Sequence, residues 1–208
     1  MTQAQRNNYD NLYIAVSGTA KKWQEQYFGE YGDSQQAQAR ARFAKIRQAA
    51  ALPLESNPLN LQRVLMTMTP NLEVSLLGHG DAASPSEWAA FQSLSFFAVH
   101  MQGATKEAHN TECSFAQSCG QLYRRRDSAS LKPRFDAIVL ARAPKIQVKH
   151  IHPMISLLRT ERLSFDYGRL AEDLRSFHSP DRRAGVLLRW SRDFVRGAQM
   201  LEQTPDNQ

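Results

Sequence analysis

Histidine, cysteine and carboxylate side chains are the groups in this sequence that could perform acid–base, nucleophilic or metal chemistry. The six histidines include one close pair, His150 and His152. Two residues apart on a helix, these rings would point in different directions, and Pro153 predicts that the pair precedes or opens a helix. The cysteines, Cys113 and Cys119, form neither a CxxC pair nor a disulfide framework. We therefore expect no metal site and no cofactor.

The spacings that catalytic motifs require are also missing. No HExxH accompanies the other four histidines, and no GxSxG, GxxxxGK[ST] or GxGxxG segment occurs. His100 ends an apolar segment, which is typical of a hydrogen-bonded core or cap residue. Glu172 and Asp173 are adjacent, so on a helix we expect them to neutralise Arg169 and Arg175. The sequence favours a binding protein over an enzyme with a histidine-centred site.

The charge of the chain is concentrated in its second half. The formal net charge is +6 and the pI is about 9.5. Residues 1–104 hold equal numbers of basic and acidic residues, whereas residues 105–208 hold eighteen Lys or Arg and twelve Asp or Glu. Such an asymmetry is typical of a polyanion partner, above all a phosphate backbone, although a mildly basic protein can also lack one.

The basic residues gather near the predicted ends of helices. Arg124–Arg126 end one helix, where cations complement the helix dipole even without a ligand. Arg182 and Arg183 begin another, where the dipole disfavours positive charge; a phosphate contact would explain them, and the adjacent Asp181 is the alternative. No zinc finger, basic zipper or RNP-type strand occurs, so backbone binding without base readout is predicted. The candidate residues are Arg124, Arg125, Arg126, Arg134, Arg142, Lys145, Lys149, Arg182, Arg183 and Arg189.

Helical periodicity must position these residues, because no run of alternating strand residues occurs. Asp33 is a candidate N-cap and Pro53 a candidate stop, while Ser84, Pro85 and Glu87 form a capping-box pattern. The sequence predicts an all-α fold, a helical bundle of about eight or nine helices with a basic face. The expected helices lie near residues 12–27, 33–51, 59–68, 84–101, 114–126, 130–142, 150–161, 166–178 and 180–197.

Gly78–Ala83 is the clearest linker in the sequence. We expect an N-terminal helical part over residues 1–78, a C-terminal helical part over 84–200 that shares its core, and a tail over 201–208. The polar segment Met1–Arg6 has no apolar stretch typical of a signal peptide, and Phe96–Val99 is far shorter than a membrane span. A cytoplasmic protein that does not contact membranes is expected.

Several segments from about residue 84 onward are similar, in order and spacing, to one known family. Phe96–His100 resembles its apolar helix ending in FALH, and Pro133–Phe135 resembles its RRF motif. Further similar segments are Ser114–Ala116 with Leu122, Ile155–Arg159, Phe165–Leu170 with Asp173–Leu174, Asp181–Arg183 and Arg189–Phe194. The sequence resembles the CasB family, the small subunit of the type I-E CRISPR surveillance complex Cascade.

This resemblance implies a helical protein without enzymatic activity that lies in the complex as a head-to-tail pair. The implied partners are the CRISPR guide RNA, the target DNA, the displaced non-target DNA strand, other Cascade subunits and a second copy of the chain. The implied role is to steady these strands in the R-loop during antiviral defence. Arg134 matches a nucleic-acid arginine of the RRF motif, and Arg182 and Arg183 match a basic pair before the last helix.

The chain departs from the family pattern at several positions. Pro133 stands in place of the first arginine of RRF, and Ala116 stands where glycine is common. Ile155–Ser156 occupy basic positions of the family, for which Lys149–His150 or Arg159 could compensate. The alternative hypothesis is a helical protein-interaction or regulatory module whose basic face meets an acidic protein.

Overall fold

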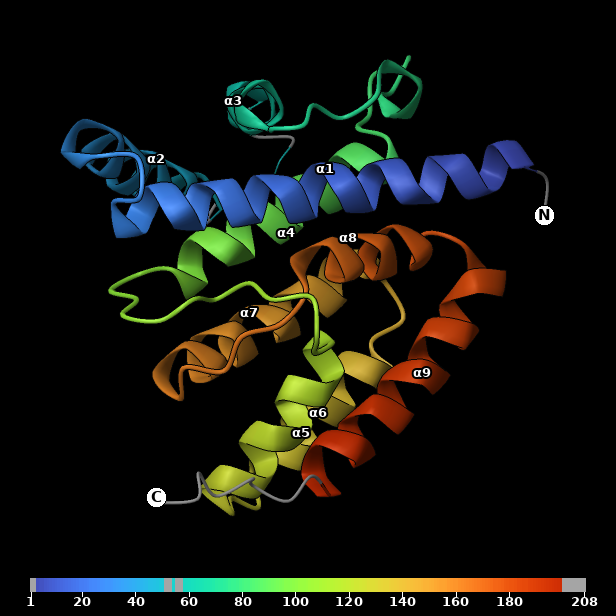
Figure 1. Ribbon diagram of the computed structural model, residues 1–208. Coiled ribbons are helices and arrows are strands. Elements are labelled where there is room, and N and C mark those ends of the chain that lie inside the picture. Colours follow the sequence, from blue (N-terminus) through green and yellow to red (C-terminus); the bar gives the residue numbers. More distant parts are fainter. Residues whose placement is uncertain (1–2, 51–53, 55–57, 200–208) are drawn as a thin grey trace.

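The computed structural model describes residues 3–50, 54 and 58–199 (Figure 1). Within these residues it contains nine α-helices, the 3₁₀ helix η2 (Val74–Leu76) and no strand, which confirms the predicted all-α fold. None of the described helices combines the length and the apolar character that crossing a membrane requires. The helices are α1 (Gln3–Phe28), α2 (Asp33–Ala50), α3 (Pro58–Thr67), α4 (Pro85–His100), α5 (Phe115–Arg126), α6 (Leu131–Leu140), α7 (Pro144–Thr160), α8 (Tyr167–Ser176) and α9 (Pro180–Gln199).

The helix α4 is the centre of the fold. Fourteen of its 16 residues are buried, and a helix that is apolar on all sides must be covered on all sides. Accordingly, α1, α2, α3, α7 and α8 all pack against it. Figure 1 shows α4 between α1 on one side and α7 and α8 on the other. Of the helices that carry the candidate basic residues, α7 packs directly against this central helix.

The start of α4 is fixed by the predicted capping box. The backbone N–H of Glu87 donates to Ser84 Oγ at 3.1 Å, and the backbone N–H of Ser84 donates to Glu87 Oε2 at 2.6 Å. Pro85 occupies the first helical position, where its missing N–H has no helical partner to lose. Local sequence alone therefore sets this boundary.

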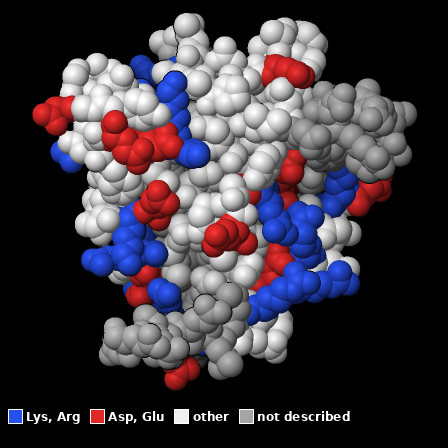
Figure 2. All heavy atoms as spheres, in the orientation of Figure 1, with Lys and Arg blue, Asp and Glu red and all other residues white. Residues whose placement is uncertain are grey.

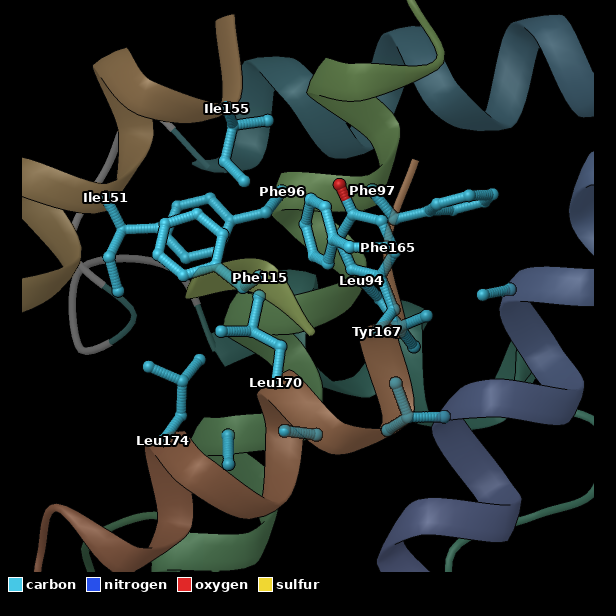
Figure 3. Packing of buried hydrophobic residues seen from close by; sticks show 14 of the residues in the cluster. Leu94, Phe96, Phe97, Phe115, Ile151, Ile155, Phe165, Tyr167, Leu170 and Leu174 are labelled. Carbon is cyan, nitrogen blue, oxygen red and sulfur yellow. The ribbon is translucent and has the colours of Figure 1, made fainter. Parts of the chain in front are cut away.

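Aromatic side chains join α4 to the C-terminal helices (Figure 3). The rings of Phe97 in α4 and Tyr167 in α8 meet edge to face, with centroids 5.1 Å apart. The ring centroid of Phe165 lies 4.3 Å from that of Tyr167 and 5.4 Å from that of Phe115 in α5. Each such pair contributes about 0.5–1.5 kcal/mol beyond burial of its area. This cluster connects α4, α5 and α8.

Two glycines allow α5 and α9 to touch through their backbones. A Cβ atom on Gly120 would lie 2.1 Å from the carbonyl oxygen of Phe194, and one on Gly197 would lie 1.9 Å from that of Gln117. Real Cβ atoms do not approach other atoms so closely, so only glycine fits at either position. Within the described residues, α5 and α9 make the most extensive contact of any helix pair.

Three predicted helix boundaries are wrong. The helix α1 begins at Gln3 and not near residue 12. Asp33 is the first residue of α2 and not its cap, because the hydrogen bond from Gln36 N to Gly32 O starts the helix one residue earlier. The helix α7 begins at Pro144 and not near 150, and Pro153 lies inside it. A proline at the first position favours a helix start, and Pro153 removes only the hydrogen bond to the carbonyl of Lys149, an exposed residue that water can reach. The predicted stop at Pro53 and the tail over 201–208 lie outside the described residues.

Candidate nucleic-acid interface

The N-terminal end of α7 carries one group of the predicted basic residues. Arg183, in the first turn of α9, donates a hydrogen bond to the carbonyl oxygen of Ala141 and another, of 3.2 Å, to Oε1 of Gln147. These contacts hold Arg183 at the turn between α6 and α7, beside Arg142 and Lys145. The structure therefore brings together basic residues from both sides of this turn and from the start of α9.

The contacts of Arg183 also explain why a cation lies at a helix N-terminus. Its guanidinium satisfies Ala141 O, which belongs to the residue that follows α6, and this structural reason involves no phosphate. Arg182, by contrast, has an exposed side chain in the same turn. Of this pair, Arg182 is the better placed to meet an external ligand.

The middle of α7 carries a second group. Arg134 of α6 and His150 of α7 line a shallow hollow of about 270 Å³. Lys145 and Lys149 are exposed and four residues apart, so they lie on one face of the helix. The exposed side of α7 is therefore basic along its first half.

The C-terminal end of α7 meets the third group, Arg124–Arg126 at the end of α5. Arg125 donates to the carbonyl oxygen of Glu161 at 3.3 Å, and Nε of Arg126 donates to Oε1 of Glu161 at 2.7 Å. The 17 residues of α7 give it a length of about 25 Å. The structure thus does not bring Arg124–Arg126 next to Arg183, but places them at opposite ends of one helix.

Arg189 belongs to a different environment, a buried charge network between α8 and α9. It forms an ion pair with Asp173, whose carboxylate also accepts a 2.5 Å hydrogen bond from the indole of Trp190. Burial raises the pKa of Asp173 to about 6, although the Arg189 charge opposes this rise. A second buried acid, Asp193, pairs with Arg169 at 3.0 Å. Arg189 therefore compensates a buried carboxylate.

The expected role of the adjacent carboxylates is confirmed for one residue only. Glu172 lies 3.9 Å from Arg175, as predicted. Asp173 points into the core and pairs with Arg189, a residue of α9 that helical spacing within α8 could not reveal. Packing between the two helices decides this pairing.

A further basic pocket lies beside the C-terminal end of α7. It has a volume of about 470 Å³ and is lined by the loop 102–108 and by residues that include Arg159 and Arg162. Lys106 and Glu107 lie on the loop side. Burial, and after it the charge of Arg159, lowers the pKa of His100, which also lines the pocket, to about 3. The pocket therefore holds a neutral imidazole and three cations against one carboxylate.

The buried histidines have structural partners. His100 is a hydrogen-bonded core residue as predicted, with Nδ1 2.9 Å from the Tyr167 hydroxyl. His109 Nδ1 accepts the backbone N–H of Tyr167 at 3.2 Å, which places the proton of the neutral ring on Nε2. This Nε2 lies 3.1 Å from Ser17 Oγ and donates to it, so it cannot remove the hydroxyl proton. The Ser17–His109 pair thus lacks the geometry of an activated nucleophile.

Metal ligands are not grouped in the part of the chain that the structure describes. No set of three or more His, Cys, Asp or Glu side chains there is arranged around a common point. His150 and His152 are both exposed on α7.

Figure 2 shows how the charges are distributed on one face of the molecule. Lys and Arg side chains gather in two places, one over α9 and one where α7 ends, as comparison with Figure 1 shows. Acidic side chains lie between them, so this face is mixed rather than uniformly basic.

Comparison with known families gives this geometry a context. Residues 42–194 match the sequence model of the family described as CRISPR-associated protein Cse2. The chain belongs to the Cse2 family. The resemblance to CasB is thereby confirmed, and the chain is a subunit of a CRISPR surveillance complex. A comparison with curated proteins finds no match.

A solved structure of similar shape supports the fold of this Cse2-family chain. The crystal structure of CasB from Thermobifida fusca is 20% identical and superposes with a TM-score of 0.64. The similarity covers 88% of this chain and 97% of that chain. At this identity the comparison establishes a shared fold.

All predicted basic residues lie inside the Cse2 match, but sequence reasoning overlooked the pocket beside α7. Lys106 lies in a polar loop next to Glu107, so the local charge is balanced. Arg162 follows the end of α7 with a backbone φ of +55°, a conformation that its residue type does not indicate. Only the folded chain brings Lys106, Arg159 and Arg162 together.

Proposed function

We propose that this Cse2-family chain binds nucleic-acid backbones within the surveillance complex and catalyses no reaction. Its ligands are the guide RNA, the target DNA and the displaced strand of the R-loop, which it steadies through phosphate contacts. The observation that carries the proposal is the distribution of basic side chains along α7. Arg142 and Lys145 stand at its beginning, Lys149 near its middle, and Arg125 and Arg126 at its end.

The length of α7 suits a strand of nucleic acid. A helix of about 25 Å spans about seven phosphates of one duplex strand at about 3.4 Å each. When cations spaced along such a helix bind phosphates, they displace the counterions of the nucleic acid and make no contact with the bases. Binding is then independent of sequence and steeply dependent on salt. Guide and displaced strands differ in sequence at every target, so a subunit that steadies them gains nothing from base readout.

The absence of catalysis is supported by the histidine geometry. The ring of His109 donates to Ser17, and burial lowers the pKa of His100 to about 3, so neither ring can serve as a general base for a nearby hydroxyl at neutral pH. A subunit that only holds strands needs no such group.

The test compares two pairs of charge-removing substitutions in the assembled complex. Arg142→Gln/Lys149→Gln removes two exposed cations of the interface, and Lys45→Gln/Arg63→Gln removes two from α2 and α3. Binding of fluorescent single-stranded and duplex DNA is followed by anisotropy from 50 to 300 mM salt. We expect the first pair to lower affinity about tenfold and the salt slope by about 1.4 to 1.8, because each lost phosphate contact removes about 0.7 to 0.9. Equal affinity for both pairs would refute the proposal.

A second function, contact with an acidic protein partner, is favoured by apolar side chains near the same turn. Leu140 is 76% exposed and Ile146 is 44% exposed, and they flank Arg142 and Lys145. Exposed apolar groups among cations suit a protein interface more than a phosphate backbone. If Leu140→Ser/Ile146→Ser prevents assembly of the complex while Arg142→Gln/Lys149→Gln leaves its nucleic-acid affinity unchanged, this second function replaces the first.

A further inference from the structure

The pocket at the C-terminal end of α7 has the shape and charge of a ligand site. Its volume of about 470 Å³ lies within the range of about 300–1,000 Å³ typical of small-molecule sites. One wall is the loop from Gln102 to Ala108, and the other is the end of α7 with Arg159 and Arg162. It is a concave site that a single nucleotide could enter.

The positive charge of this pocket is not balanced inside the protein. Arg159 donates a 2.8 Å hydrogen bond to Oε1 of Gln102, a neutral group. Among the described residues, Glu107 is the one acid that lines the pocket, and the carboxylate of Glu161, the residue before Arg162, is already bound by Arg126 at 2.7 Å. Burial lowers the pKa of Arg47, and the charge of Arg159 adds to this effect, so a fourth cation stands close by. An anion in the pocket would relieve this repulsion.

The loop wall also offers groups that suit a phosphate. Gly103 adopts a φ of +66°, and a Cβ atom there would meet nothing within 4 Å, so the backbone is open to an approaching ligand. Thr105 contributes a hydroxyl-bearing side chain to the same wall. Backbone N–H groups, hydroxyls and cations together are the usual partners of phosphate oxygens.

The pocket continues the basic surface at the end of α7. Glu161, which Arg125 and Arg126 hold, is the residue between Thr160 and Arg162, and both of these line the pocket. Glu161, whose carboxylate is bound by Arg126, therefore lies between the cations Arg125 and Arg126 and the residues that line the pocket. Figure 2 shows this concentration of Lys and Arg where α7 ends.

We propose that this pocket receives one nucleotide of a single-stranded nucleic acid, with its phosphate held between Lys106, Arg159 and Arg162. The inference rests on the proposed backbone binding and adds to it a defined site for one unstacked nucleotide. A base that leaves the stack enters the concave space, whereas a duplex is too wide to do so. The site accordingly favours single strands over duplexes.

The test removes the two cations at the rim of the pocket. Lys106→Gln/Arg162→Asn lowers the charge by two, and asparagine tolerates the positive φ of position 162. The matched control is Lys45→Gln/Arg63→Gln, which removes two exposed cations elsewhere. The probes are a fluorescent single-stranded DNA of twenty thymidines and a duplex of equal length, titrated with the full chain at 50 to 300 mM salt. Thermal unfolding checks that both variants fold, and Lys106→Gln alone replaces the double variant if that one does not.

We expect the pocket variant to bind the single strand at least about tenfold more weakly than the control, with a salt slope lower by about 1.4, and the duplex about equally well. The single strand with 4-thiothymidine should crosslink, on irradiation, to the peptide that contains residues 102–108. Equal single-strand affinity of variant and control would refute the pocket site. So would tight binding of adenosine monophosphate that the oligonucleotide does not displace, because that result assigns the pocket to a free nucleotide.

The outcomes separate this inference from the proposed function. If Arg125→Gln/Arg126→Gln weakens binding and the pocket variant does not, the interface stands and the pocket site fails. If the wild-type chain, alone and in the complex, binds neither probe, both proposals fail.

Discussion

Gly120 of α5 lies so close to Phe194 of α9 that a Cβ atom on the glycine would be 2.1 Å from the Phe194 carbonyl oxygen. The neighbouring contact of Gly197 with Gln117 repeats this relationship from the other helix. The helix pair that contains Arg124–Arg126 and Arg189 is therefore set by backbone contact, not by side chains that could adapt.

Gly120→Ala should destabilise the protein strongly. The added methyl group has to push α9 away, and overpacking of this kind costs about 1–3 kcal/mol or more. The free energy of unfolding, measured by urea denaturation followed by circular dichroism, should fall by at least that amount. An unchanged midpoint would show that the two helices are not in backbone contact.

Gly185→Ala on α9 is the matched control and should have the opposite effect. A Cβ atom at Gly185 meets nothing within 4 Å, so alanine adds helix propensity without a clash. We expect the free energy of unfolding to rise by about 0.5–1 kcal/mol. A loss of stability here would mean that glycine is required at this position for another reason.

Asp173 should make the protein more stable as the pH falls toward 4. Burial raises the pKa of Asp173 from 3.8 to about 6, so between these values the folded state holds a proton that the unfolded chain has released. The contribution of this group to the free energy of unfolding therefore decreases as pH rises, by up to about 1.4 kcal/mol per pH unit. In Asp173→Asn the side chain at position 173 does not titrate, so the free energy of unfolding of this variant lacks this pH-dependent contribution. The free energy of unfolding of wild type, relative to that of Asp173→Asn, should therefore fall steadily from pH 4 to 6, and a constant difference would contradict the prediction.

His100 should make the protein less stable as the pH falls, the opposite of the effect of Asp173. Burial, with the charge of Arg159 added, lowers the pKa of His100 from 6.5 to about 3, so in this window the unfolded chain holds the extra proton. Its contribution to stability is complete above the unfolded pKa and is lost as pH falls toward 3. Replacement by glutamine, which can still bond Tyr167, should make acid unfolding less steep. Urea midpoints of both proteins at pH 4, 5, 6 and 7 measure this change.

Arg183 and Arg142 should separate stability from binding. Arg183→Ala leaves the carbonyl of Ala141 without its donor and removes a guanidinium that lies 5.4 Å from the Phe177 ring centroid. We expect a loss of about 1–3 kcal/mol in the free energy of unfolding. Arg142→Ala, at an exposed position, should change it by less than about 0.5 kcal/mol while weakening DNA binding. A stable Arg183→Ala protein would show that these contacts contribute little.

Arg189→Ala should reduce stability, because it leaves Asp173 buried without its cation. The expected loss is about 1–3 kcal/mol near pH 7, and it should be smaller at pH 5, where Asp173 is protonated. Adding Asp173→Asn should recover much of it. Calorimetry of the two single variants and the double variant gives the coupling energy, and a value of zero would place the two residues in independent environments.

The fold was largely predictable because its signals are local. The Ser84–Glu87 capping box and the dense run of apolar residues that follows it define α4 without reference to the rest of the chain. The start of α7 was missed because Pro153 resembles a helix start, while its tolerance inside the helix depends on the exposure of Lys149 in the folded protein. The division into parts 1–78 and 84–200 remains a prediction.

The candidate site was predictable in composition but not in arrangement. Charge asymmetry identified the basic half, yet the partners of Arg183 and Arg189 come from other helices. Sequence spacing cannot distinguish a cation that satisfies a carbonyl from one that awaits a phosphate. The pocket at Lys106 was missed for the same reason, since Lys106 lies more than fifty residues before Arg159 and Arg162 in the chain.

Both ends of α7 are held by arginines of the glycine-packed pair, Arg126 from α5 and Arg183 from α9. The distance between the cation groups at Arg126 and Arg183 therefore depends on the contact between α5 and α9 at the uncharged residues Gly120 and Gly197. In a genetic screen for loss of immunity, substitutions at Gly120 or Gly197 should score with those at the arginines themselves. Natural variation at these glycines would then be restricted as tightly as at any charged position.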